Sequence, residues 1–181
     1  PKVTDIPPLL PTEYHTDYRN PKIDFGEDPL VVFEAYGQLL GNEAKLTGSD
    51  TATTEQFGSS VSAVSGADGM YILVGSDGKS LSKGRAYLYH STSVGITEQI
   101  LTASDVHHVA GQELGVSVSI VSGADGIYAM VGAWEDDEVA SEAGAAYIFH
   151  SSSAATLTLT EQKLTASDGA ADDDFGLGVS I

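Results

Sequence analysis

Two stretches of this chain are almost the same: residues 57–75 read FGSSVSAVSGADGMYILVG, and residues 114–132 read LGVSVSIVSGADGIYAMVG. The second stretch follows the first at a constant offset of 57 residues. Self-similarity at a fixed period is typical of repeat architectures, in which each unit folds into the same group of elements and buries its apolar face against its neighbour. The chain is therefore predicted to be a tandem repeat protein.

The similarity continues downstream of both stretches. Residues 84–91 (GRAYLYHS) match residues 144–151 (GAAYIFHS), and residues 97–105 (TEQILTASD) match residues 160–168 (TEQKLTASD). A third Phe-Gly pair stands at Phe175-Gly176 and is continued by Leu-Gly-Val-Ser-Ile. Each repeat is thus about 57–63 residues long.

One repeat contains the signals of four short strands. We expect them near residues 57–65, 70–75, 85–91 and 97–103, because β-branched and aromatic residues either alternate or form short apolar runs there. The first two are joined by Ser-Gly-Ala-Asp-Gly, in which Asp-Gly is a tight-turn signal. Four antiparallel strands in a repeat of this length predict an all-β fold of tandem propeller-type blades.

The repeats predict five segments along the chain. These are an extended Pro-containing arm at 1–27, a partial blade with its junction at 28–56, complete blades at 57–113 and 114–174, and the first strand of an incomplete blade at 175–181. We therefore expect about two complete blades and two half-blades. Because a propeller closes with about four to eight blades, these segments do not close one by themselves.

The stretch from Leu164 to Gly176, LTASDGAADDDFG, resembles the junction between blades of bacterial FG-GAP proteins. Val74-Gly75-Ser76 and Val131-Gly132-Ala133 resemble the Gly-Ala part of the same motif, and the resemblance extends over about residues 40–181. It implies a relative of the integrin α-chain propeller, whose family binds proteins or glycans at the cell surface. It therefore also implies an extracellular or cell-surface location.

One departure from this family concerns calcium. Many FG-GAP blades carry an Asp-x-Asp-x-Asp-Gly loop between their first two strands, but residues 65–69 and 122–126 each read Ser-Gly-Ala-Asp-Gly. Calcium takes about six to eight oxygen ligands, and a single carboxylate cannot supply them. Calcium therefore has only weak support in this sequence, and no other cofactor is expected.

The acidic balance of the chain limits its partners. With 26 acidic and 8 basic residues the formal net charge is −18, so binding to nucleic acid is not expected, since phosphate contacts need Lys and Arg. No apolar run approaches the ~18 residues of a membrane-spanning helix, so membrane insertion is not expected either. The chain has no Cys, which excludes disulfides and thiolate ligands.

An acidic loop that holds the sole tryptophan is the candidate ligand site. Trp134, Glu135, Asp136 and Asp137 follow the second strand of the second complete repeat. A tryptophan ring stacks on a sugar ring while carboxylates bond its hydroxyls, so this loop predicts a glycan or protein ligand. The alternative is a solvated acidic loop.

The densest acidic cluster of the sequence is a candidate metal site. It consists of Asp168, Asp172, Asp173 and Asp174. Carboxylates are the ligands that hard cations such as calcium prefer, so a cation is one interpretation of this cluster. A solvated turn between two blades is the other.

Polar residues recur at matching positions of the two repeats. His90 matches His150, and a residue repeated in this way is predicted to be structural. The neighbouring turns carry candidate positions for O-linked sugars, at Ser91, Thr92, Ser151 and Ser152.

The two half-blades are complementary. Residues 30–49 carry the pattern of a third and a fourth strand, and residues 175–181 carry the pattern of a first strand. One expectation is therefore strand completion between two copies, with the contact made by Phe175, Leu177, Val179, Ile181, Val31 and Phe33. The other expectation is that the sequence is a piece of a longer propeller.

Chemistry-bearing motifs do not stand out in this sequence. It contains no nucleophile motif and no phosphate-binding loop, so enzyme activity is not expected. We expect an extracellular scaffold that assembles head-to-tail into a filament or a ring, and the extended arm favours the filament. The alternative function is a surface adhesion module that binds a glycan or a protein.

Overall fold

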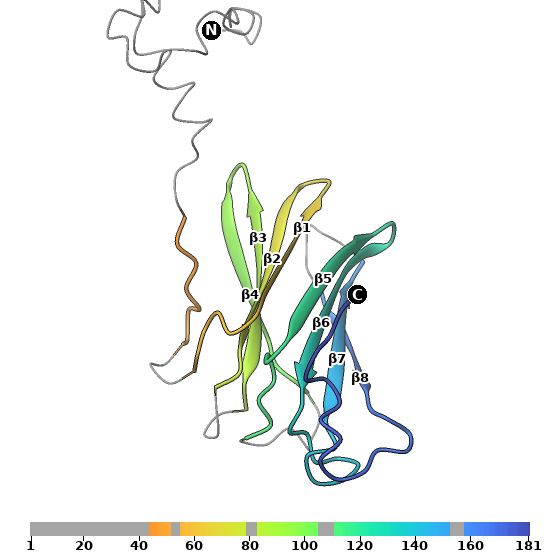
Figure 1. Ribbon diagram of the computed structural model, residues 1–181. Helices are drawn as coiled ribbons and strands as arrows, with labels where there is room; N and C mark the ends of the chain where they lie inside the picture. Colours follow the sequence, from red (N-terminus) through yellow and green to blue (C-terminus); the bar gives the residue numbers. More distant parts are fainter. Residues whose placement is uncertain (1–43, 52–54, 79–82, 105–110, 153–157) are drawn as a thin grey trace, which may run out of the picture. The chain divides into compact units, whose positions relative to one another are not determined.

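The computed structural model describes residues 44–51, 55–78, 83–104, 111–152 and 158–181. The chain divides into two units, Pro1–Lys45 and Leu46–Ile181, and the fold described below is that of the second unit. Its described residues form eight strands and no helix (Figure 1). The predicted all-β class is therefore confirmed.

The strands form two antiparallel sheets of four strands each. Blade 1 consists of β1 (Val61–Gly66), β2 (Gly69–Ser76), β3 (Arg85–Thr92) and β4 (Gly95–Leu101). Blade 2 consists of β5 (Val118–Gly123), β6 (Gly126–Ala133), β7 (Ala145–Ser151) and β8 (Thr160–Leu164). In both sheets, strands that follow one another in the sequence are neighbours in space, which is the arrangement of a propeller blade.

The bounds of two predicted strands need correction. The expected second and third strands, 70–75 and 85–91, agree with β2 and β3 to within one residue. The first strand begins at Val61 and not at Phe57, because the preceding residues turn and Ser59 N donates to the carbonyl of Gln56 at 3.1 Å. The fourth strand covers Gly95–Leu101 instead of 97–103, since the hairpin already pairs Gly95 with Thr92.

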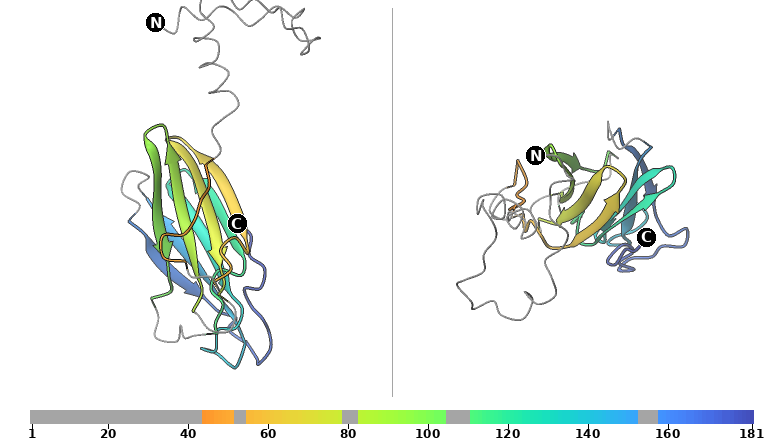
Figure 2. Two further views of the ribbon diagram at one scale, coloured as in Figure 1. Left: turned by 90° about the vertical axis from the view of Figure 1, so that its left-hand side faces the viewer. Right: turned by 90° about the horizontal axis from the view of Figure 1, so that it is seen from above.

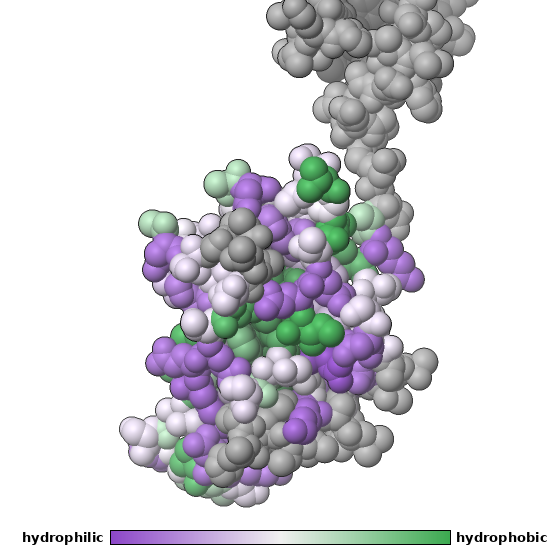
Figure 3. All heavy atoms as spheres, turned by 180° about the vertical axis from the view of Figure 1, so that it is seen from behind, coloured by the Kyte–Doolittle hydropathy of each residue, from purple (hydrophilic) through white to green (hydrophobic). Residues whose placement is uncertain are grey.

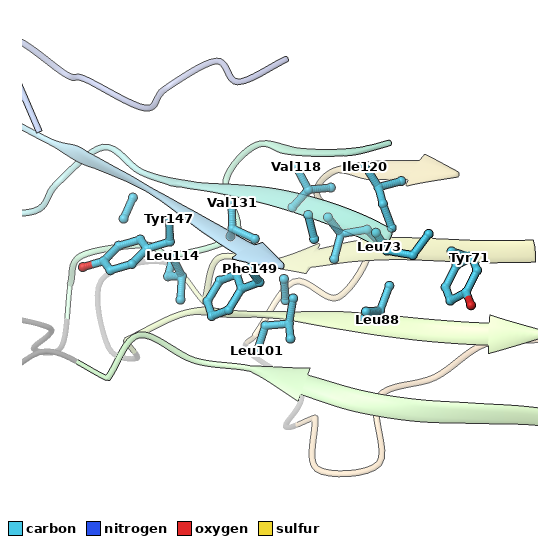
Figure 4. Close-up of a cluster of buried hydrophobic side chains, with 14 of the residues drawn as sticks. Tyr71, Leu73, Leu88, Leu101, Leu114, Val118, Ile120, Val131, Tyr147 and Phe149 are labelled. Carbon is cyan, nitrogen blue, oxygen red and sulfur yellow. The ribbon is translucent and has the colours of Figure 1, made fainter. Parts of the chain in front are cut away.

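The two sheets pack face to face around an apolar core, and Figure 2 shows them as adjacent layers. Successive side chains of a strand point to opposite faces, so one face of each sheet supplies alternate residues to this core. The core includes Tyr71, Leu73, Leu88 and Leu101 of blade 1 and Val118, Ile120, Val131, Tyr147 and Phe149 of blade 2 (Figure 4). These faces are called the inner faces below, and the opposite faces the outer faces.

The outer face of blade 1 is also apolar. Val74, Tyr87 and Tyr89 form a second buried cluster there, against which Leu46 and Phe57 pack. Other hydrophobic side chains of this unit are left in contact with solvent, and hydrophobic residues gather between hydrophilic ones in the space-filling view from behind (Figure 3). Both faces of the blade 1 sheet therefore bury apolar side chains, as sheets do when they are stacked between layers.

Blade 2 approaches blade 1 at a glycine. A Cβ atom on Gly75 of β2 would lie 2.0 Å from the carbonyl oxygen of Gly115, which stands at the start of the second repeat. The arrangement recurs one repeat later, where a Cβ atom on Gly132 of β6 would lie 1.9 Å from the carbonyl oxygen of Gly176. Only glycine permits two backbones to come this close, so these positions fix the separation between one blade and the next.

Serine hydroxyls connect the first strands of consecutive blades. In β5, Val118 N donates to Ser60 Oγ at 3.0 Å and Ile120 N donates to Ser62 Oγ at 3.2 Å. The two sheets have separate backbone ladders. These bonds therefore help to set the register of blade 2 against blade 1.

We expect Gly75→Ala to lower the free energy of unfolding by about 2 kcal/mol or more, because the added methyl group would overlap the carbonyl of Gly115 and force the two blades apart. Urea denaturation measures this change. Gly178→Ala is the matched control, since a Cβ atom there meets nothing within 4 Å. Equal stability of the two variants would show that the close approach is not needed.

Candidate functional site

The chain continues past blade 2 as if another blade were beginning. Val179 N donates to Ser117 Oγ at 3.1 Å, and Ile181 N donates to Ser119 Oγ at 3.2 Å. These bonds repeat, one blade later, the bonds by which β5 is held on blade 1. Residues 175–181, called the C-terminal segment below, therefore occupy the position of a first strand.

The C-terminal segment has no partner strand within the described residues. Apart from a single parallel bridge between Gly144 and Phe175, it takes part in no sheet. Of the predicted assembly residues, Phe175 is 38% exposed, Leu177 54% and Ile181 45%, whereas Val179 is half-buried. Val31 and Phe33 lie outside the described residues. The segment thus leaves the apolar side chains of Phe175, Leu177 and Ile181 exposed.

The outer face of blade 2 carries a hollow of about 440 Å³. It is lined by Tyr128, Ile148, His150, Thr160, Glu161, Gln162 and Ile181. Two of these residues have counterparts in blade 1: Tyr128 corresponds to Tyr71, and Ile148 corresponds to Leu88. In blade 1 these side chains are covered by blade 2 and are only 1% and 0% exposed. The hollow on blade 2 therefore corresponds to the surface of blade 1 against which blade 2 packs.

A tyrosine stacks on a histidine at the same position of each blade. The ring centroids of Tyr71 and His90 are 4.2 Å apart, and those of Tyr128 and His150 are also 4.2 Å apart. Both tyrosine hydroxyls donate to the aspartate of the preceding tight turn, at 3.0 Å to Asp68 and 2.6 Å to Asp125. The repeated Asp-Gly-x-Tyr spacing is the sequence signal for this group, whereas the repetition of His90 and His150 by itself predicts only that the histidines are structural.

Hydrogen bonding and burial raise the pKa of both phenols above the ordinary tyrosine value. Burial, followed by the hydrogen bond to Asp68, raises the pKa of Tyr71 to about 12. The bond to Asp125 raises the pKa of Tyr128 and, in the other direction, lowers the pKa of the Asp125 carboxyl. The hydrogen bonds to Asp68 and Asp125 tie each tight turn to the sheet behind it.

A serine and a glutamate connect consecutive repeats at a second place. Ser49 N donates to Glu98 Oε2 of β4 at 3.1 Å, and the Ser49 hydroxyl donates to the same carboxylate. One repeat later, Ser104 N and Ser104 Oγ donate to Glu161 of β8, at 3.2 Å and 3.0 Å. Each glutamate on a fourth strand, β4 or β8, thus binds the serine of a Leu-Thr-x-Ser-Asp segment that lies one repeat earlier in the sequence.

The predicted ligand loop is organised by internal contacts. Trp134 Nε1 donates to Glu113 Oε2 at 2.9 Å. Asp136 is 1% exposed, so its carboxylate points into the protein, which disfavours a role in ligand binding. Asp137 is exposed, and its carboxylate accepts a bond from Glu142 N at 2.7 Å. For Trp134, Glu135 and Asp137, ligand binding stays a prediction.

Asp136 is buried because it has a cation as its partner. Lys163 Nζ lies 2.8 Å from Asp136 Oδ2 and 2.7 Å from Glu138 Oε2. The Tyr147 hydroxyl donates to Asp136 Oδ2 at 3.1 Å, and Lys163 Nζ lies 5.4 Å from the centroid of the Tyr147 ring. Blade 1 has Ile100 at the position of Lys163, so this network belongs to the second repeat alone. It holds the acidic loop against the end of its own sheet.

Glu135 is in a setting that disfavours its charge. Burial is the largest cause that raises the pKa of its carboxyl, and the nearby carboxylates of Glu113 and Glu142 add to it. Repulsion between like charges that are partly withdrawn from water opposes folding at neutral pH. The loop therefore contains one carboxylate whose ionisation works against the folded state.

The four aspartates of the candidate metal site do not converge. Within the described part of the chain, no group of three or more His, Asp or Glu side chains is placed to hold a metal ion. Asp173 Oδ2 instead accepts a bond from Ala170 N at 2.7 Å, while Asp172 N and Asp174 N donate to the carbonyls of Ser141 and Glu142. This geometry favours the solvated turn, the alternative stated for Asp168 and its neighbours.

One of the candidate glycosylation positions is inaccessible. Ser151 is 1% exposed in the folded protein, which disfavours the attachment of a sugar there. Ser152 is exposed, and Ser91 and Thr92 are half-buried at the end of β3. O-glycosylation at these three residues stays a prediction.

Two four-stranded antiparallel sheets, joined through the same glycine contact and the same serine bonds at each step, define a tandem propeller-type repeat protein. A family model described as FG-GAP repeat matches residues 40–89, 96–149 and 159–181. The chain therefore belongs to the FG-GAP repeat family, as the resemblance predicted. A comparison with curated proteins finds no match.

The family gives a coarse outline of function. FG-GAP repeats form propeller-type modules of binding and adhesion, occur in extracellular or surface proteins, and are generally non-enzymatic. Among the described residues there is no helix of the length and hydropathy that crossing a bilayer requires.

Replacing Lys163 with methionine should destabilise the protein by about 3 kcal/mol, because the carboxylate of Asp136 would remain buried without its cation. The free energy of unfolding of Lys163→Met, compared with that of Lys83→Met, provides the test. Lys83 is exposed, so its substitution removes the same charge without breaking a buried pair. A loss below about 0.5 kcal/mol would mean that the ion pair contributes little.

Glu135→Gln should raise Tm at pH 7. The folded-state pKa of Glu135 lies above its unfolded value, so the ionisation of Glu135 removes stability as pH rises from the unfolded pKa through the folded one. The advantage of the variant should disappear below about pH 4, where both states of the wild-type protein are protonated. Thermal unfolding from pH 3 to 8 measures this; a gain that is constant across the range would contradict the electrostatic cause.

Proposed function

We propose that this protein is an extracellular scaffold whose copies assemble head-to-tail by completing blades between one another. The observation that carries the proposal is the C-terminal segment, which is already held on blade 2 by the bonds of Val179 and Ile181 and lacks a partner strand within the described residues. An edge with unpaired backbone groups is a ready template for the strand of another chain.

Two features of the described surface support assembly over binding by a single copy. The hollow on the outer face of blade 2 matches a surface that a following blade covers on blade 1. The exposed side chains of Leu177 and Ile181 extend the apolar area beside it. A contact between the end of one copy and the beginning of the next is heterologous, so it forms a filament or, if the rotation closes, a ring.

A surface module that binds a glycan or a protein is the second candidate function. The family favours it, because FG-GAP repeats form binding and adhesion modules. The proposed contact surface of such a module would be Trp134, Glu135 and Asp137. Because Trp134 Nε1 already donates to Glu113, this N–H group is not available to a ligand. We therefore rank this function below assembly.

Deletion of Phe175 to Ile181 should leave the protein monomeric, whereas the undeleted chain of 18.8 kDa should form larger species as its concentration rises. Size-exclusion chromatography with light scattering measures the masses. Val179→Pro offers a milder variant, since it removes the amide that donates to Ser117 without shortening the chain. Trp134→Ala, which leaves the C-terminal segment intact, should still assemble.

Assembly of the deletion variant at the same concentration as the undeleted chain would overturn the proposal. So would an undeleted chain that stays monomeric at every concentration. Assembly that is lost equally in Trp134→Ala would point to a general loss of structure, which circular dichroism of the three variants detects.

A further inference from the structure

We propose that the side chains of Lys163 and Asp136 join in a covalent amide bond, with Glu138 as the proton carrier. The reaction is a condensation: the lysine nitrogen replaces one oxygen of the aspartate carboxyl group, and a water molecule leaves. The bond lies within blade 2, so the proposal does not depend on the proposed assembly between copies. It rests on the contacts and the burial of these three side chains.

The nucleophile and the carboxyl group are in contact. Lys163 Nζ donates to Asp136 Oδ1 at 2.9 Å and to Asp136 Oδ2 at 2.8 Å. The nitrogen therefore lies next to the carbon atom that both oxygens share. Reactants held together in this way no longer depend on an encounter in solution, which can be worth an effective concentration of about 10⁵ M or more.

The reacting pair is withdrawn from water. The Asp136 side chain is 0% exposed, and the Lys163 side chain is 14% exposed. An ammonium and a carboxylate become a neutral amine and a carboxylic acid by the transfer of one proton, and removal from water favours a neutral pair over two separate charges. Because only the neutral amine is a nucleophile, burial favours the form that reacts.

Asp136 is held in place through its backbone and through both carboxyl oxygens. Its amide donates to the carbonyl of Ala133 at 3.2 Å, and its carbonyl accepts a bond from Gly144 N at 2.9 Å. Its Oδ1 accepts a bond from Glu138 N at 3.1 Å, and its Oδ2 accepts one from the Tyr147 hydroxyl at 3.1 Å. Donors at these oxygens stabilise the negative charge that develops when nitrogen adds to the carboxyl carbon.

Glu138 is placed to carry a proton. Its Oε2 lies 2.7 Å from Lys163 Nζ, and its side chain is 40% exposed. The Lys163 ammonium first passes one proton to the Asp136 carboxylate, and the amine then adds to the carboxyl carbon. Glu138 takes a second proton from the nitrogen and gives it to the leaving hydroxyl group. One water leaves, one hydrogen stays on the amide nitrogen and the Glu138 carboxylate is restored, so the reaction needs no other reactant.

The bond is specific to blade 2 and joins strands that are not neighbours. Lys163 of β8 pairs with Tyr147 of β7, whereas blade 1 has Ile100 opposite Tyr87 and therefore has no amine at this position. The bond ties the loop after β6 to β8 across β7, so one covalent link holds three strands of the sheet. The chain has no Cys, so a disulfide cannot take this role.

The intact mass of the 181-residue chain, measured after denaturation of the folded protein, tests the proposal. We expect a mass below that of the sequence by one water molecule. A protease that cleaves after Glu separates Asp136 from Lys163 at Glu138, Glu142 and Glu161. The two residues should nevertheless be recovered in peptides that remain joined to each other.

Lys163→Arg is the matched control, because a guanidinium group keeps the positive charge beside Asp136 but stays protonated and does not act as a nucleophile. This variant should have the full mass of its sequence. Glu138→Gln keeps the size of the proton carrier and removes its basicity, so linkage should slow by about a hundredfold. The freshly purified Glu138→Gln protein should therefore be largely unlinked.

A wild-type chain that keeps its full mass after prolonged incubation in the folded state would overturn the proposal and leave the ion pair alone. A loss of water that persists in Lys163→Arg would also overturn it, because the water would then come from another site. Complete linkage in freshly purified Glu138→Gln would overturn the assignment of the proton carrier. Circular dichroism of each variant shows whether it has folded.

Discussion

The fold depends on the close approach of two backbones at a glycine. Gly75 of β2 and Gly132 of β6 each receive the carbonyl of a glycine from the following repeat, at a separation that a methyl group would abolish. The two sheets share no ladder, and isolated backbone bonds between repeats, such as that from Leu114 N to the carbonyl of Lys83 at 3.2 Å, leave most of the placement of the next blade to other contacts. The glycine contact, the serine bonds and the Ser–Glu contact perform that task together.

The same three contacts define the end of blade 2. Each is present there in part: Gly176 rests on Gly132, and Ser117 and Ser119 hold the C-terminal segment, while Ser167, the serine of the Leu-Thr-Ala-Ser-Asp segment at 164–168, has no carboxylate within the described residues. The candidate site is therefore not a pocket added to the fold. It is the same junction that joins blade 1 to blade 2, here between blade 2 and the C-terminal segment, with no further sheet among the described residues.

The repeat made the class and most strands predictable, because short alternating patterns recur in the same order and each copy confirms the other. Contacts that involve a residue present in one repeat and replaced in the other could not be predicted from the repeat pattern. Lys163 stands where the first repeat has Ile100, and this exchange lets Asp136 be buried instead of facing solvent as the sequence suggested. Burial of Ser151 was equally hidden, since strand alternation alone does not say which face a neighbouring sheet will cover.

The Ser60 and Ser62 bonds to β5 recur, at Ser117 and Ser119, in the bonds to the C-terminal segment. Because every step of the stack uses the same small set of residues, a gene segment that encodes one blade can be duplicated or removed without redesigning the surfaces on either side. Chain length in such a protein is then a variable that evolution changes in whole units, and the strength of each joint is inherited with the unit.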